Sequence, residues 1–163
     1  MNALKTISIV VLASIMPSLT WGSEVTSLFA MNDDVTHWMG TGVSFDAELE
    51  ESTPYRVDLM TRRINENQRM ERLTIIPEGG LPRIVTCIVT LTGKKQLKDC
   101  DSGTGETVVL GSVWQTIFHA DDGTTADASG AIDDGGERMR IMRTYSIGDD
   151  VILYAHESMQ RVQ

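Results

Sequence analysis

Three histidines and an aspartate-rich stretch are the side chains of this 163-residue chain whose types first suggest chemistry. Histidine is a common metal ligand and a common general base near neutral pH. His37, His119 and His156 share no spacing typical of a ligand set. A single histidine on a strand is more often an ordinary surface or core residue. The sequence therefore indicates no metal site and no catalytic histidine.

The aspartates between residues 121 and 134 resemble a calcium-binding loop only in composition. They are Asp121, Asp122, Asp127, Asp133 and Asp134. An EF-hand loop alternates its acidic residues and carries a glycine at its sixth position, which this stretch does not. Two solvated hairpin turns are the preferred interpretation. The sequence also has no hydrolase, P-loop or dinucleotide-binding motif, so we assign no catalytic residue and no cofactor.

The two cysteines are expected to form a disulfide. If Gly93 and Lys94 form a two-residue hairpin loop, the strands on either side pair so that Cys87 lies opposite Cys100. Counting outward from the loop makes this a non-hydrogen-bonded pair, in which Cα atoms approach to about 4.5 Å. A disulfide can bridge that distance. The spacing is not C-x-x-C, so a redox-active pair is not indicated.

This register has one awkward consequence. It places Lys98 and Gln96 on the same strand face as Val89 and Leu91. A longer loop would shift the pairing by two residues and remove the cysteines from opposition. Both registers are left open by the sequence.

Residues 1–22 are predicted to be a cleaved signal peptide. Lys5 gives a positive start, residues 7–16 form an apolar run, and cleavage is expected after Gly22. Ten apolar residues are too few to span a bilayer, and no other run approaches that length. The mature chain is therefore expected to be periplasmic or secreted, without a transmembrane segment. An oxidising compartment also suits the disulfide.

The charge of the chain argues against nucleic acid as a partner. The formal net charge is −9, and an acidic protein of this size repels phosphate backbones. Residues 56–98 are the exception, with nine basic and four acidic residues. Two interpretations remain open for them: a patch for an anionic ligand, or cross-strand charge pairing on a solvated face, which is preferred. The arginines concerned are Arg56, Arg62, Arg63, Arg69 and Arg72.

Regularly spaced turn signals predict the elements that would position these residues. Turns rich in Gly, Asp and Asn separate stretches of about ten residues that are rich in Val, Ile, Thr and Tyr, which is typical of antiparallel strands. The expected strands are 35–45, 55–64, 69–76, 82–91, 96–101, 106–119 with a bend at Gly111, 124–132, 138–147 and 150–160. An open sheet of this size would expose two edges, whereas closure removes them. We therefore predict an all-β, antiparallel up-and-down barrel of about 8–10 strands over residues 35–163, after a lead-in at 23–34 that could form a short helix.

Two motifs at opposite ends of the barrel region carry a family resemblance. The first is His37-Trp38-Met39-Gly40-Thr41-Gly42, and the second is residues 143–154, RTYSIGDDVILY. Together they resemble the calycin-type small barrels, especially bacterial lipocalin-like proteins and the nitrobindin group. The resemblance implies structural roles for Trp38, Gly40, Gly42 and Arg143. Trp38 would pack at the barrel floor against Arg143 or Arg140, as a cation–π contact.

Three functional hypotheses follow. In the first, the exported barrel is lipocalin-like and binds a small, largely apolar ligand between apolar strand faces. In the second, it is an exported interaction or inhibitor protein with a filled barrel that acts through its loops. The third is a haem-binding nitrobindin-like protein; in that group a histidine after the barrel holds haem, and the late histidine here is His156. Under the first hypothesis the candidate lining residues are Tyr55, Val57, Leu59, Trp114, Phe118, Tyr145 and Tyr154.

Overall fold

The computed structural model describes residues 34–93, 95–133 and 135–162. The predicted signal peptide and nearly all of the lead-in at 23–34 lie outside these residues. Ten strands and no helix occupy the described part of the chain. None of the described residues belongs to a helix that could span a membrane.

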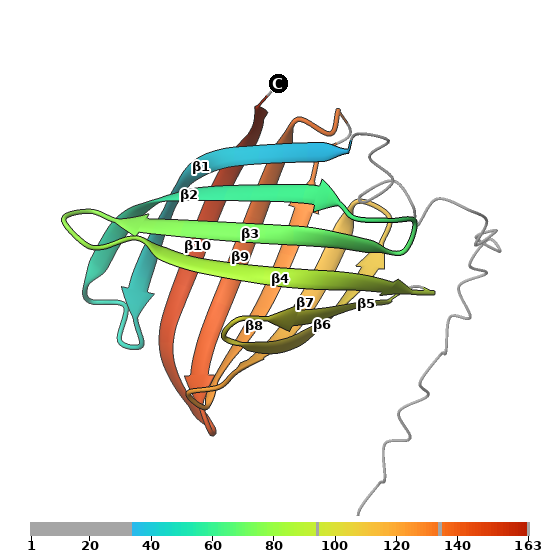
Figure 1. Cartoon of the computed structure of the whole chain (residues 1–163). Helices are drawn as coiled ribbons and strands as arrows, with labels where there is room; N and C mark the ends of the chain where they lie inside the picture. The colour runs from blue at the N-terminus through green and yellow to red at the C-terminus, as the bar shows by residue number, and fades with distance from the viewer. Residues whose placement is uncertain (1–33, 94, 134, 163) are drawn as a thin grey trace, which may run out of the picture.

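Each strand pairs antiparallel with its neighbours in the sequence, and β1 pairs with β10 to close the barrel (Figure 1). The strands are β1 (Val35–Asp46), β2 (Ser52–Arg63), β3 (Gln68–Pro77), β4 (Arg83–Thr92), β5 (Lys95–Cys100), β6 (Gly103–Leu110), β7 (Val113–Ala120), β8 (Thr124–Ile132), β9 (Arg138–Ile147) and β10 (Asp150–Val162). The predicted all-β, up-and-down barrel is confirmed, at the upper end of the expected strand number. Closure leaves no strand edge unpaired.

The single strand expected over residues 106–119 is wrong. The chain reverses at Gly111, which has a φ of +62°, and Leu110 pairs with Val113 across a two-residue turn. Glycine adopts this left-handed conformation without steric cost, which suits a tight hairpin. The turn between the strands expected at 96–101 and 106–119 is also shorter than expected, because Cys100 pairs with Gly103.

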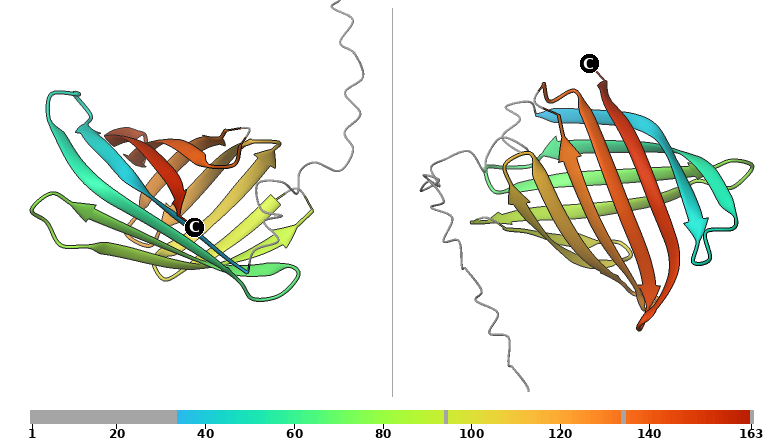
Figure 2. Two further views of the ribbon diagram at one scale, coloured as in Figure 1. Left: turned by 90° about the horizontal axis from the view of Figure 1, so that it is seen from above. Right: turned by 180° about the vertical axis from the view of Figure 1, so that it is seen from behind.

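The strands on the two sides of the barrel run in different directions, so that β1–β4 cross over β8–β10 (Figure 1). In Figure 1, β1–β4 run in front of the steeply inclined β8–β10. The view from above in Figure 2 shows the same two groups on opposite sides of the barrel. The two groups therefore face each other across the barrel interior.

The main cluster of buried apolar side chains lies on one side of that interior. It is formed by residues of β1, β2, β8, β9 and β10: Trp38, Tyr55, Val57, Ala128, Met139, Ile141, Ala155 and Met159. Gly40 permits the closing pair to approach, because a Cβ there would lie 2.0 Å from the Ser158 carbonyl oxygen. No residue of β3–β7 belongs to this cluster, but Cys87 and Val89 of β4 and Val109 of β6 are also buried. Leu73, Ile75 and Trp114 of β3 and β7 pack against the cluster.

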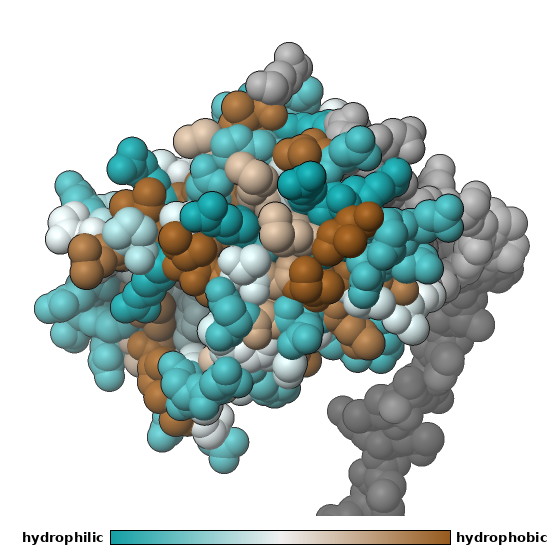
Figure 3. All heavy atoms as spheres, viewed as in Figure 1, coloured by the Kyte–Doolittle hydropathy of each residue, from teal (hydrophilic) through white to brown (hydrophobic). Residues whose placement is uncertain are grey.

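The outer surface is polar with apolar side chains scattered over it. On the face formed by β1–β4, Figure 3 shows small apolar groups separated by hydrophilic residues. Met39, Met60, Ile84 and Ile88 are among the exposed apolar residues of these strands. Scattered apolar side chains are normal on a protein surface.

Candidate ligand-binding site

A cavity of about 790 Å³ occupies the barrel interior. Its apolar lining includes side chains from β2, β3, β4 and β7, namely Leu59, Leu73, Ile75, Val85, Trp114 and Phe118. Pockets that take small molecules usually enclose about 300–1,000 Å³ and combine apolar walls with a few polar groups. The cavity is therefore large enough for a small organic ligand.

Glycines beneath aromatic rings help to keep the cavity open. Gly42 pairs with Tyr55 across the β1–β2 ladder, and Gly130 pairs with Trp114 across β7–β8. A Cβ on either glycine would lie 2.3 Å from a ring atom of its partner. The rings can therefore lie close against the wall only because the glycines have no side chain. Gly105 and Phe118 form a third pair of this kind, on β6 and β7.

The first interior ionic cluster is centred on Glu157 of β10, whose side chain is 0% exposed. Glu157 accepts hydrogen bonds from Arg143 Nε at 2.9 Å and from Arg143 Nη2 at 3.0 Å. The Tyr55 hydroxyl donates a third, at 3.0 Å to Oε1. Strands β2, β9 and β10 are thus joined inside the barrel by a bidentate ion pair and a phenol.

The environment of this cluster fixes the protonation of its donors. Burial and the neighbouring Glu157 carboxylate raise the pKa of Tyr55 well above its ordinary range. Burial alone would lower the pKa of Arg143, but the attraction of Glu157 outweighs it and the pKa is raised. Tyr55 is therefore a neutral hydrogen-bond donor and Arg143 is a permanent cation.

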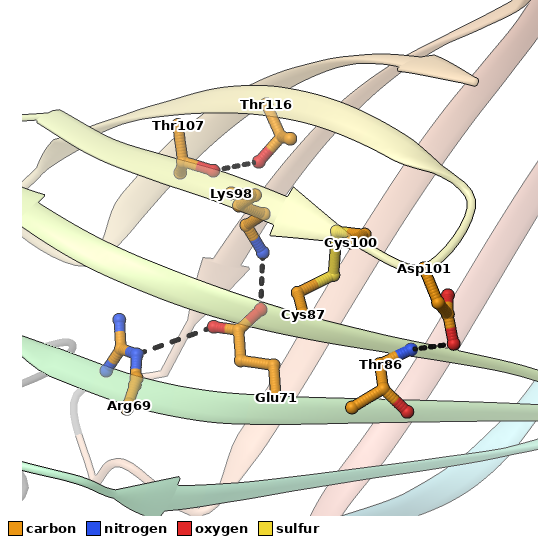
Figure 4. Close-up of a disulfide and its surroundings, with 9 residues drawn as sticks. All are labelled: Arg69, Glu71, Thr86, Cys87, Lys98, Cys100, Asp101, Thr107 and Thr116. Atoms are coloured by element: carbon orange, nitrogen blue, oxygen red, sulfur yellow. Dashed lines mark hydrogen bonds and ion pairs between the residues drawn. A yellow bond between two sulfur atoms is a disulfide. The ribbon is translucent and has the colours of Figure 1, made fainter. Parts of the chain in front are cut away.

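The second interior cluster lies between β3 and β5 (Figure 4). Lys98 Nζ donates to Glu71 Oε2 at 2.5 Å, and Arg69 Nε lies 3.5 Å from Oε1 of the same carboxylate. Burial alone would raise the pKa of Glu71, but Lys98 and Arg69 outweigh it and lower the pKa. Glu71 is therefore an anion held by two cations in the barrel wall.

Acid should weaken the fold in part through Glu71. Its pKa is lowered in the folded protein, so below the ordinary glutamate pKa of about 4.3 the unfolded chain binds the proton more readily. The stabilisation is complete above that value and is lost as pH falls through the folded pKa. We expect the stability difference between the wild type and Glu71→Gln to narrow from about pH 6 to about pH 3, measured by urea unfolding. A constant difference over this range would contradict the assignment.

The β4–β5 hairpin has the register that places the cysteines opposite each other. Thr92 pairs with Lys95 and Cys87 with Cys100, and the two sulfurs are bonded at 2.04 Å. The predicted disulfide is confirmed (Figure 4).

The same register explains the polar residues that had argued against it. Gln96, on the inner face of β5, is buried at 3% exposure. Lys98 also lines the cavity, where it pairs with Glu71. The Glu71 carboxylate accommodates Lys98 inside the barrel. The alternative register, shifted by two residues, is therefore not needed to explain these polar side chains.

The structure brings five of the seven candidate lining residues together around the cavity: Tyr55, Leu59, Trp114, Phe118 and Tyr145. Val57 also belongs to the interior, but it is packed in the core at 2% exposure and does not line the cavity. Tyr154 is 36% exposed and lies on the outer face. It alternates with the buried Ala155, and the β9–β10 pairing shifts register just before it, between Val151 and Leu153.

The arginines of residues 56–98 do not form one patch. Arg69 points into the interior and Arg63 lines the cavity where β2 ends. The other three, Arg56, Arg62 and Arg72, are exposed. Strand alternation therefore divides the basic segment between the two faces of the wall.

None of the three histidines lines the cavity. His37 Nε2 lies 2.9 Å from Asp58 Oδ2, and His119 Nδ1 lies 3.2 Å from the Thr125 hydroxyl. His156 is exposed on β10. Within residues 34–162, apart from 94 and 134, no three metal-ligating side chains come together.

The two arginines predicted to pack against Trp38 have different surroundings in the structure. Trp38 is buried in the core at 3% exposure. Arg143 binds Glu157, and Arg140 is exposed on β9. A buried carboxylate on the neighbouring strand is a stronger partner for Arg143 than an aromatic ring.

Sequence reasoning did not identify Glu157, Glu71 or Lys98 as site residues. For Glu157 a signal was present, because Ala155, Glu157 and Met159 share one strand face by alternation. A charged residue between small and apolar neighbours on a core-facing row indicates an interior polar group. Its partners could not be read in the same way, because they lie on strands whose register is not visible in the sequence.

Comparison with known proteins bears on the fold. No family model matches the sequence, and no curated protein matches it. A protein of unknown function from the DUF3598 family of Nostoc punctiforme superposes with a TM-score of 0.67 and 17% identity, covering 80% of this chain and 48% of that protein. An S-type phycobiliprotein lyase from Guillardia theta superposes with a TM-score of 0.61 and 7% identity, covering 78% of this chain and 87% of the lyase.

These likenesses concern the barrel and not its activity. The chain spans about half the length of the DUF3598 protein. At such low identity only the fold is shared. A closed antiparallel barrel agrees with the calycin-type resemblance of the two sequence motifs.

Proposed function

We propose that this chain is an exported barrel that binds a small, largely apolar ligand in its interior. The observation that supports this most directly is the cavity of about 790 Å³. Its aliphatic and aromatic walls would remove apolar surface of a ligand from water, at about 25 cal/mol for each Å² buried. Two ionic clusters are fixed in the same wall and give the interior a small number of oriented polar groups.

Export is supported by the N-terminal sequence and by the disulfide. Residues 1–22 have the charge and apolar length of a signal peptide. Cys87 and Cys100 are bonded, and structural disulfides persist mainly in oxidising compartments.

The two alternatives have less support. A filled barrel acting through its loops does not fit an interior of this volume. A haem held by a late histidine such as His156 has less support as well, because none of His37, His119 and His156 lines the cavity. The likeness to a lyase supports a barrel of this shape and carries no activity to this chain.

Filling the cavity should weaken binding of an apolar probe. Val85 lines the cavity, and its neighbour Ile84 is 47% exposed on the outer face of β4. We expect Val85→Phe to reduce the affinity for N-phenyl-1-naphthylamine by about tenfold, a change of about 1.4 kcal/mol. Ile84→Phe adds an aromatic ring one residue away and should leave the affinity unchanged. Probe fluorescence on titration measures both variants.

The proposal fails if the wild type does not bind the probe. It fails equally if the two variants weaken binding to the same extent, because the probe would then report an outer surface patch.

A further inference from the structure

The charge of the cavity lining is opposite in sign to that of the chain. The chain carries a formal net charge of −9. The lining nevertheless contains five cations and three acidic residues: Arg63, Arg69, Arg83, Lys98 and Arg143 against Glu66, Glu71 and Asp122. Glu157, buried against Arg143, adds one more carboxylate to the interior. Although the protein as a whole is acidic, these five cations line the cavity, where a bound ligand would meet them.

Three of these cations, Arg143, Lys98 and Arg69, are already engaged in the interior clusters. Arg143 is held by Glu157 through two of its nitrogens. Lys98 is held by Glu71, which also lies beside Arg69. A ligand would have to displace a buried carboxylate to use either cluster, and that costs a buried ion pair.

Arg83 is differently placed. It is the first residue of β4, it lines the cavity, and it forms no ion pair or side-chain hydrogen bond with any residue that the structure describes. It pairs in the ladder with Ile75, next to the apolar wall of Leu73 and Val85. Its exposed side chain therefore stands where the apolar cavity meets the end of the barrel formed by residues 47–51, 78–82, 101–102, 121–123 and 148–149.

Tyr145 supplies a second donor at the same end. It lines the cavity from β9, and its hydroxyl makes no hydrogen bond within the described residues. Burial raises its pKa, whereas Arg143 and Arg83 act in the opposite direction, so both cations lie within electrostatic reach of the hydroxyl. The phenol is neutral near pH 7 and can donate to an anion.

Several acidic residues occupy the turns at this end, among them Glu78, Asp101, Asp121, Asp122 and Asp149. Of these, Asp122 lines the cavity, and it is already engaged. Asp122, in the β7–β8 turn, accepts a hydrogen bond from the Thr124 backbone amide at 2.9 Å. At the opposite end Arg63 also lines the cavity, but Glu66 of the adjoining turn lines it too. Within the cavity lining, the end that carries Arg83 and Tyr145 is thus the one where a ligand would meet a cation and a phenol outside the two interior clusters.

We propose that the ligand is an amphiphile with a single acidic group, which binds between the Arg83 guanidinium and the Tyr145 hydroxyl while its apolar part fills the cavity. This inference rests on the proposed function and names the chemical class of its ligand. The wall that leads inward from these two residues is apolar, because Phe118 and Ala126 lie in the same cross-strand row as Tyr145. An acidic headgroup at the end of the barrel and a hydrocarbon chain within it match this division.

The test compares ligands that differ only in the headgroup. Dodecanoic acid, dodecyl phosphate and dodecan-1-ol are titrated into the full chain by displacement of N-phenyl-1-naphthylamine at low salt. We expect at least one of the two acids to bind about tenfold more tightly than the alcohol, because a hydrogen bond to a charged group is stronger than one to a neutral group. The two acids distinguish a carboxylate from a phosphate headgroup.

Three variants locate the headgroup. Arg83→Gln should remove most of the preference for the acid and leave the alcohol within about twofold of the wild type. Tyr145→Phe should reduce acid binding by a smaller factor. Arg63→Gln removes a cavity-lining cation at the other end and should change neither ligand.

The outcomes separate the two proposals. Equal binding of acids and alcohol would overturn this inference and leave the proposed function in place. A preference for acid that survives Arg83→Gln and is lost in Arg63→Gln would overturn the placement. No binding of any of the three ligands would overturn the proposed function and this inference with it.

Discussion

Replacing Glu157 by alanine should lower the free energy of unfolding by about 3–5 kcal/mol, measured by urea denaturation. The side chain is fully buried and accepts three hydrogen bonds, two from Arg143 and one from Tyr55. Alanine would leave the Arg143 side chain, only 16% exposed, without its counter-ion and the Tyr55 hydroxyl without its acceptor. An unpaired buried charge is the costly element, more than the lost bonds themselves.

A double variant distinguishes that explanation from simple loss of packing. Arg143→Leu together with Glu157→Leu removes both charges and keeps apolar volume in the barrel. We expect it to be clearly more stable than Glu157→Ala, because replacing both partners of a buried pair is often close to neutral. A loss below about 1 kcal/mol in Glu157→Ala, or a double variant less stable than the single one, would contradict the account.

Removing the disulfide should cost about 3 kcal/mol, the value of the chain-entropy model for a short ring. Cys87 and Cys100 are 13 residues apart and close the β4–β5 hairpin. The double variant Cys87→Ala/Cys100→Ala releases that restraint on the unfolded chain. It also loosens β5, the shortest strand at six residues, which carries Lys98 into the second cluster.

Reduction provides the control for this prediction. The wild type in reducing buffer should unfold at the same urea concentration as the double variant, because both lack the same covalent link. If the double variant and the oxidised wild type unfold at the same midpoint, the disulfide contributes nothing to stability.

Local chemistry made much of the fold predictable from the sequence. A two-residue turn at Gly93 and Lys94 predicted one of two possible pairing registers, and that register places Cys87 opposite Cys100, as the structure has it. Turn residues act within a few positions of the chain, so their effect can be read directly. The failure at Gly111 has the same origin, because a single glycine in an apolar run is equally compatible with a bend and with a hairpin.

The side-chain contacts inside the barrel depend on pairing between distant segments, so they could not be predicted in full from the sequence. Arg143 and Glu157 meet only because β9 and β10 pair with a register shift between Val151 and Leu153. The same pairing places Tyr154 on the outer face. The sequence contains these residues without stating which strand opposes which, and a shift of one residue exchanges the two faces.

The volume of the cavity is even harder to predict from the sequence than the strand pairing. It depends on how Tyr55 and Trp114 lie over Gly42 and Gly130 of the neighbouring strands. The sequence places aromatic residues on rows predicted to face inward, which is compatible with a filled barrel as well as a hollow one. Side-chain packing in three dimensions decides between them.

Native mass spectrometry of the protein purified from its source, under conditions that keep the fold intact, tests the central claim most directly. The account predicts a wild-type chain that carries one small organic molecule. That molecule should be retained in Ile84→Phe, on the outer face, and lost in Val85→Phe, inside the cavity. A wild-type chain that carries nothing, or a molecule retained equally in both variants, would contradict the account.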